Sequence, residues 1–136
     1  PVGLHHFPEP AQAQLFLSGA LRDLVEREPA ASVGVVAAGE AAARAIHATL
    51  EAVPGVRLVL DGAFPFEPGV DVTDVDGARG LEWDYVVVPD ATASAYPAEE
   101  EARRRLHVAV TRASHQLWIL SWGRRTPLLA PPARAA

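Results

Sequence analysis

The sequence contains two short, continuous apolar runs, SVGVVA at residues 32–37 and YVVV at residues 85–88. A short run that is apolar at every position is typical of a strand buried on both faces, as in a parallel sheet. Helical patterns follow both runs, the first up to about residue 50 and the second over residues 98–113. Helices that alternate with buried strands predict an α/β fold with a mainly parallel sheet.

Further elements of the same kind complete one domain. Pro29 ends a helical pattern, because the residue before a proline disfavours the helical conformation. The adjacent His5 and His6 lack the spacing of a metal site, so the first residues are expected to form a loose terminus. The expected elements are a helix at 11–28, strands at 56–60, 70–75 and 116–121, and a loop at 61–69. The domain is expected to span residues 1–121, followed by a flexible tail over 122–136.

The composition excludes several classes of site. The chain has 136 residues and no cysteine, so disulfides, zinc-thiolate sites and cysteine nucleophiles are excluded, and no metal site is expected. No apolar run is long enough to span a membrane, and the first residues do not resemble a signal peptide. We therefore expect a cytoplasmic protein without a membrane partner.

The chain also contains no lysine, since all 12 of its basic residues are arginine. A Walker A loop needs a lysine on the phosphates, so this chain cannot be a complete P-loop ATPase. The formal net charge of -5 argues against strong DNA binding by the chain alone, because phosphate contacts supply most of the affinity of nucleic-acid binders.

Two segments carry residues suited to chemistry. The first is TDVDGARGLEWD at residues 73–84, in which the glycines allow sharp turns and Glu82 precedes a strand. A carboxylate there can accept hydrogen bonds from a ribose hydroxyl. By itself this pattern favours an ordinary loop with solvated acids, because glycines and acids together are a weak signal.

The second segment is EEEARRRLHVAVTRA at residues 99–113. Helix electrostatics explain Arg103 and Arg105, which follow acidic residues at a spacing of four. They explain Arg112 less well, because it lies near the end of the predicted helix among apolar residues. Arg112 either caps the last carbonyl groups or points at an anion.

The expected ligand positions follow from the predicted sheet. Ligands of parallel α/β sheets bind at the carboxyl ends of the strands. We therefore expect the site in the loops after Val36, Val75 and Val88 and around the helix that carries Arg112.

Taken together, the two segments resemble a known family. GLEWD at residues 80–84 is similar to motif V of UvrD/Rep-type superfamily 1 DNA helicases, and LHVAVTRA at residues 106–113 is similar to their motif VI. The order of the motifs and the gap between them agree as well. The resemblance implies the C-terminal RecA-like motor domain, a three-layer fold of the P-loop NTPase type without its own Walker A loop.

The resemblance also implies roles for individual residues. Arg112 would be the catalytic arginine finger on the γ-phosphate of ATP. The nucleotide-binding residues would be Gly80, Glu82, Thr111 and Arg112, and Asp76, Gly77 and Arg79 would face DNA. ATP and Mg²⁺ would bind only together with the N-terminal RecA-like domain of the same parent chain. Single-stranded DNA would be the track of the motor, and the isolated chain would be inactive.

Departures from the family pattern leave an alternative open. Asp76 stands where many members carry a histidine near DNA, whereas Arg79 replaces a lysine and keeps the charge. The alternative is a degenerate RecA-like module that docks on RNA polymerase or a repair protein without ATP turnover. A free-standing nucleotide-binding protein is disfavoured, because no phosphate loop is present.

Overall fold

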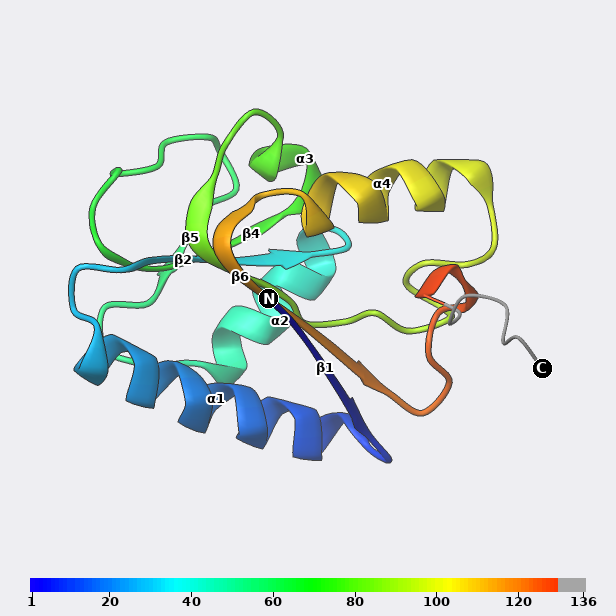
Figure 1. The fold of residues 1–136 in the computed structure, drawn as a ribbon, viewed down its shortest axis with the longest axis horizontal. Helices are drawn as coiled ribbons and strands as arrows, with labels where there is room; N and C mark the ends of the chain where they lie inside the picture. The colour runs from blue at the N-terminus through cyan, green and yellow to red at the C-terminus, as the bar shows by residue number, and fades with distance from the viewer. Residues whose placement is uncertain (130–136) are drawn as a thin grey trace.

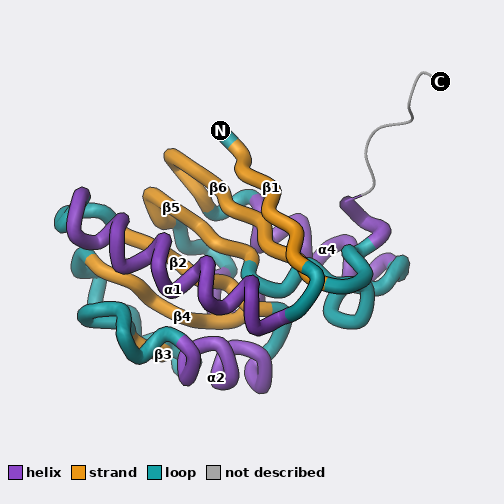
Figure 2. Tube along the Cα trace, turned by 90° about the horizontal axis from the view of Figure 1, so that it is seen from below, coloured by secondary structure: helices purple, strands orange, loops and turns teal. Residues whose placement is uncertain are grey.

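The computed structural model describes residues 1–129 and contains one six-stranded sheet (Figure 1). The strand order is β1-β6-β5-β2-β4-β3, and all neighbouring strands are parallel. Helices α1 and α2 cover one face of the sheet, and α3 and α4 cover the other (Figures 1 and 2). This is the three-layer α/β fold that the sequence predicts. The elements are β1 (Val2–Phe7), α1 (Pro10–Arg27), β2 (Ser32–Ala37), α2 (Glu40–Thr49), β3 (Arg57–Leu58), β4 (Gly69–Asp74), α3 (Val75–Ala78), β5 (Trp83–Val88), α4 (Glu100–Val110), β6 (Ala113–Trp122) and a short 3-10 helix (Pro127–Leu129).

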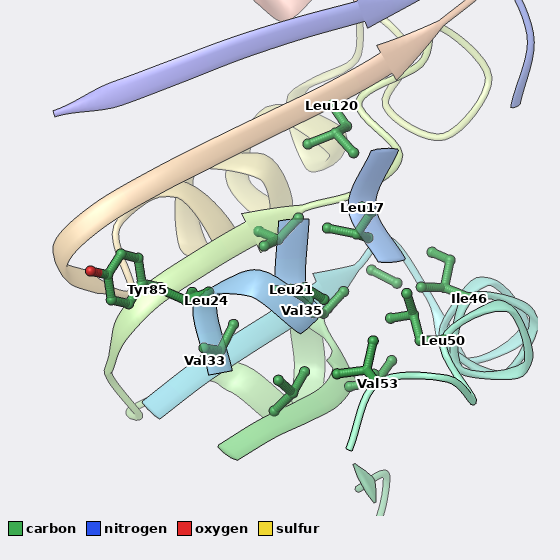
Figure 3. Close-up of a cluster of buried hydrophobic side chains, with 14 of the residues drawn as sticks. Leu17, Leu21, Leu24, Val33, Val35, Ile46, Leu50, Val53, Tyr85 and Leu120 are labelled. Atoms are coloured by element: carbon green, nitrogen blue, oxygen red, sulfur yellow. The ribbon is translucent and has the colours of Figure 1, made fainter. Parts of the chain in front are cut away.

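Helix α1 shows how local sequence and packing agree. It begins at Pro10, and a capping box between Glu9 and Gln12 satisfies its first amide groups. Leu17 and Leu21 lie four residues apart and therefore share one face of the helix. Both are buried in the cluster that α1 and α2 form against the sheet (Figure 3).

Strand β2 lies inside the sheet, between β5 and β4. Val33 and Val35 face α1 and α2, and Val36 belongs to the cluster under α3 and α4. Burial on both faces explains why this strand appears in the sequence as a continuous apolar run. Gly34 lies directly under the indole ring of Trp83, where a Cβ atom would overlap the ring.

Two predictions about the ends of the chain are wrong. Val2–Phe7 is not a loose terminus, because it forms β1 at the edge of the sheet, paired with β6. Its residues alternate in exposure, so it lacks the continuous apolar signal of a central strand. The predicted tail is also shorter than expected, since β6 includes Trp122 and the buried Thr126 bonds the carbonyl of Tyr96. The rest of that tail, residues 130–136, lies outside the described residues.

The helix predicted at residues 98–113 is shorter in the structure. Helix α4 ends at Val110, and the Thr111 hydroxyl donates to helix carbonyls of the last turn. The carbonyl of Arg112 accepts the amide hydrogen of Trp83 instead of continuing the helix. Arg112 therefore lies in the link between α4 and β6 and not on the helix.

Gly34→Ala should destabilise the fold. The added methyl group must push the buried Trp83 ring away from β2, and overpacking of this kind costs about 1–3 kcal/mol. Chemical denaturation of the two proteins measures the difference in the free energy of unfolding.

Gly19→Ala is the matched control, because it is the same substitution with an open space around it. Gly19 lies inside α1, where alanine is favoured over glycine by about 0.5–1 kcal/mol, so this variant should be more stable than the parent. Equal stability of the Gly34→Ala variant and the parent would contradict the tight contact.

Candidate functional site

The candidate residues lie at the two opposite ends of the strands, which form the amino-terminal and the carboxyl-terminal edges of the sheet. Asp76 and Gly77 lie in α3, which follows the carboxyl end of β4. Glu82 directly precedes β5 and Arg112 directly precedes β6, so both lie at the amino ends of their strands. The expectation that all of these residues gather at the carboxyl ends is therefore wrong, because the segment from β4 to β5 must cross the sheet before a parallel strand can begin.

Glu82 and Arg112 lie beside each other at the amino-terminal edge. The amide of Trp83 donates to the carbonyl of Arg112 at 3.0 Å, and Trp83 pairs with Ala113 in the sheet. Neighbouring strands are about 4.8 Å apart, so the side chains that precede β5 and β6 start from adjacent backbone positions. The structure thus brings the backbones of Glu82 and Arg112 to neighbouring positions, although the two residues are 30 positions apart in sequence.

The guanidinium of Arg112 is only partly satisfied. Its Nη2 donates to Thr111 Oγ1 at 3.1 Å, while its buried Nε has no partner among the described residues. No carboxylate of residues 1–129 forms an ion pair with it. A buried N–H group without a partner is unfavourable, so an anion at this edge would gain hydrogen bonds that the protein does not supply.

Gly80 gives the backbone its turn before Glu82. Its φ of 78° lies in the left-handed region, and the amide of Leu81 donates to Ala78 across the turn at 3.0 Å. Glu82 is exposed, and within residues 1–129 its carboxylate forms neither a hydrogen bond nor an ion pair. The carboxylate is therefore open to a ligand from outside the chain.

A hollow of about 410 Å³ adjoins Glu82 at the same edge. Its floor holds Trp83 and Phe64, whose rings meet edge to face with centroids 5.7 Å apart. Three parts of the chain line it. They are positions 64 and 66–68 of the loop before β4, residues 80–84 before and in β5, and positions 30, 32 and 71.

Arg57 and Asp71 hold this hollow together. Asp71 is buried in β4 and accepts hydrogen bonds from Arg57 Nε at 2.7 Å and from Trp83 Nε1 at 3.2 Å. The same guanidinium donates to the carbonyls of Glu67 and Pro68 at 3.2 and 3.3 Å. The buried carboxylate is thus paired, and the loop is tied to the sheet.

At the carboxyl-terminal edge, Asp76 is already paired. Its Oδ1 lies 3.2 Å from Arg105 Nη1 and 3.7 Å from Arg79 Nε. The second terminal nitrogen of Arg105 donates to the carbonyl of Ala38, which links α4 to the end of β2. A Cβ atom at Gly77 would overlap Thr73 Oγ1, so this backbone passes close to β4. Asp76 therefore pairs with both Arg79 and Arg105 at this edge.

Asp90 is a second buried carboxyl group, just after β5. Its Oδ2 accepts the amide hydrogen of Ala38 at 3.0 Å, while its Oδ1 has no partner among the described residues. Burial raises the pKa of Asp90 to about 6, against the smaller opposing effect of its backbone hydrogen bonds. Burial also raises the pKa of the nearby Tyr96, whose hydroxyl is another buried group without a partner in the described part of the chain.

Sequence reasoning missed Arg57, Asp71, Phe66 and Asp90. A signal existed for Asp71, because an acid inside an apolar strand usually has a buried partner. Nothing local identified its partner Arg57. Within residues 1–129, no group of three His, Cys, Asp or Glu side chains could hold a metal ion. None of the helices in this part of the chain is both long and apolar enough to cross a bilayer.

Comparison with known proteins places these features in a family context. Residues 69–120 match the family model described as the UvrD-like helicase C-terminal domain. A solved structure, the C-terminal domain of a possible DNA helicase from Lactobacillus plantarum WCFS1, is similar with a TM-score of 0.78 and 26% sequence identity. That match covers 94% of this chain and 78% of the other. No curated protein matches the chain.

Asp90→Asn should change how stability depends on pH. Because the folded-state pKa of about 6 exceeds the ordinary value of 3.8, the unfolded chain releases its proton first as the pH rises. The contribution of Asp90 to the free energy of unfolding is therefore full below about pH 4 and is lost by about pH 6. The loss amounts to at most a few kcal/mol. Asparagine keeps the acceptor for Ala38 and removes the charge, so the variant should be more stable than the parent at neutral pH.

Denaturation at several pH values between 4 and 7 measures this difference. Asp61→Asn is the control, because Asp61 also accepts one backbone amide hydrogen but is exposed. Parallel pH profiles for the Asp90→Asn variant and the parent protein would show that Asp90 is not the titrating group.

Proposed function

We propose, from the match of residues 69–120 to the UvrD-like helicase C-terminal domain model, that the chain is the second motor domain of an ATP-dependent superfamily 1 DNA helicase or translocase. The observation that carries the proposal is the pairing of β5 with β6, which brings Glu82 and Arg112 to one edge. Neither side chain is used by an ion pair within the described residues. Both are therefore free to meet a nucleotide.

Each candidate residue has a distinct proposed role at this edge. Glu82 accepts hydrogen bonds from the ribose, and Gly80 lets the backbone approach it. Arg112 places its planar guanidinium on the γ-phosphate, where it stabilises charge that develops during phosphoryl transfer. Thr111 orients Arg112 through the hydrogen bond between Thr111 Oγ1 and Nη2.

ATP and Mg²⁺ require a second domain under this proposal. The chain has no lysine for a phosphate loop and, among residues 1–129, no acidic cluster suited to a metal ion. The donors present fit a ribose and a phosphate, and they do not fit a magnesium ion. The N-terminal RecA-like domain of the parent chain would supply the phosphate loop and the metal ligands.

Single-stranded DNA is proposed to pass along the opposite, carboxyl-terminal edge. Asp76, Gly77 and Arg79 lie there, and residues 73–84 run from this edge to Glu82 without interruption. Closure of the ATP site would therefore shift a segment that also meets the DNA. The ion pairs of Asp76 with Arg79 and Arg105 keep the proposed DNA contact weak.

One observation favours a docking module as a second candidate. Asp76 neutralises two arginines at the edge where a DNA phosphate would bind. A domain that docks on RNA polymerase or a repair protein does not need those arginines on DNA. The two candidates differ in whether Arg112 is needed for ATP turnover.

Arg112→Lys in the full-length protein should abolish most ATP turnover. Lysine keeps the charge but lacks the two-pronged donor set, and arginine fingers contribute about 10³–10⁵ in rate. ATP binding should weaken much less, because the charge develops in the transition state. Steady-state hydrolysis and equilibrium nucleotide binding measure the two effects separately.

Arg104→Lys is the matched control, since Arg104 is an exposed arginine of α4 paired only with Glu100. It should leave turnover and melting temperature unchanged. Normal turnover in the Arg112→Lys variant would reduce Arg112 to a local hydrogen-bonding role and favour the docking module.

Asp76→Asn should strengthen the binding of single-stranded DNA by the full-length protein. The change frees Arg79 and Arg105 for phosphate contacts, and each contact steepens the dependence of log affinity on log salt by about 0.7. Fluorescence anisotropy over a series of salt concentrations measures both affinity and slope.

Asp23→Asn removes the same charge from an exposed ion pair with Arg27 on α1, which covers the opposite face of the sheet from α3 and α4. It should leave the salt slope unchanged. An equal gain of affinity in both variants would mean that net charge alone, and not the position of Asp76, controls DNA binding.

A further inference from the structure

The chain contains two Asp-Gly steps, Asp61–Gly62 and Asp76–Gly77, and it contains no asparagine. An aspartate before a glycine is chemically vulnerable, because the glycine has no Cβ atom to shield its backbone nitrogen from the neighbouring carboxyl group. The two steps carry the same reacting atoms. A difference in their reactivity must therefore come from the structure around them.

The structure protects the step at Asp76. Gly77 lies in α3, and its amide donates to Asp74 Oδ1 at 2.9 Å. The Asp76 carboxylate is paired with Arg79 and Arg105, which keep it ionised. An amide nitrogen that is hydrogen-bonded and fixed in helical backbone is held away from the carboxyl carbon beside it. Reaction at this step requires local opening of α3.

The step at Asp61 is open. Asp61 and Gly62 are exposed and lie in the loop between β3 and β4. Within residues 1–129, the Gly62 amide donates to no protein acceptor and the Asp61 carboxylate forms no ion pair. Asp61 Oδ1 accepts the amide hydrogen of Ala63 at 3.0 Å, so the carboxyl group is folded back over the Gly62 peptide.

We infer that Asp61 is a modification site, at which the chain isomerises to isoaspartate without an enzyme. The isoaspartate is then a substrate for a protein carboxyl methyltransferase that uses S-adenosylmethionine. The inference rests on the contrast between the open step at Asp61 and the closed step at Asp76, and it does not depend on the proposed function.

The reaction needs only water. The Gly62 nitrogen loses its proton and bonds to Cγ of Asp61, and one carboxyl oxygen leaves as water, which gives a five-membered cyclic imide. Water then adds to one of the two imide carbonyl carbons. Cleavage on the side-chain side restores aspartate, and cleavage on the main-chain side links the chain through Cγ and frees the α-carboxylate. The methyltransferase moves the methyl group of S-adenosylmethionine to this carboxylate and releases S-adenosylhomocysteine.

The change in the main chain falls between two anchored residues. Isomerisation inserts the Cβ methylene group of Asp61 into the backbone. On one side, the amide of Val59 donates to the carbonyl of Val72 at 2.9 Å, and on the other side Phe64 is buried against Trp83. The added length is therefore confined to the loop, and the paired strands should stay folded.

Ageing of the folded, full-length protein tests the site. After incubation at physiological temperature, the protein is digested and the fragments are methylated with radiolabelled S-adenosylmethionine. Chymotrypsin, which cleaves after Phe66, separates the two steps, because trypsin leaves both in one fragment between Arg57 and Arg79. The fragment with Asp61 should carry about 10- to 150-fold more label than the fragment with Asp76, since a hydrogen bond to a charged acceptor protects by about that factor.

Asp61→Glu should reduce the label of the first fragment to background, because glutamate would have to form a less favourable six-membered imide. Asp76→Glu is the matched control and should leave that label unchanged. Asp61→Asn is the positive control, because asparagine passes through the same imide and releases ammonia, which leaves more readily than water.

Ageing in concentrated urea isolates the effect of the structure. Both fragments should then be labelled to a similar extent, because unfolding removes the protection of Gly77. Equal labelling of the two fragments in the folded protein, or a fragment with Asp61 that stays unlabelled, would overturn the inference. The same unequal labelling in urea as in the folded protein would show that local sequence, and not the fold, sets the difference.

Discussion

The hydrogen bond from the amide of Trp83 to the carbonyl of Arg112 sets the geometry of the candidate site. It begins the parallel ladder between β5 and β6, and the chain has already left α4 before Arg112. In this register, Arg112 and Glu82 directly precede neighbouring strands at one edge.

Two buried carboxyl groups in the same sheet have opposite environments. Asp71 receives side-chain hydrogen bonds from Arg57 and Trp83, so it connects the loop before β4 to the start of β5. Asp90 receives one backbone hydrogen bond from Ala38, and burial therefore raises its pKa. The paired group stiffens the amino-terminal edge, where the hollow lies. The poorly paired group weakens the opposite edge at neutral pH.

An all-parallel sheet also explains why one segment reaches both edges. Each connection between parallel strands must return across the sheet, and the connection from β4 to β5 does so with a four-residue helix and a glycine turn. This crossover is short, because only five residues separate Asp76 from Glu82. In the proposed motor, this short connection would link the ATP edge to the DNA edge.

The sequence by itself determined the α/β class, the buried strand at residues 32–37, the limits of α1 to within one residue and the absence of a phosphate-loop lysine. These features are local, because periodicity and composition report how one element is buried. Only the tertiary structure decided that Val2–Phe7 is a strand, that Arg57 pairs with Asp71 and that Glu82 lies beside Arg112. Each of these depends on contacts between residues distant in sequence, and an edge strand or a surface arginine has the same local pattern whichever partner it meets.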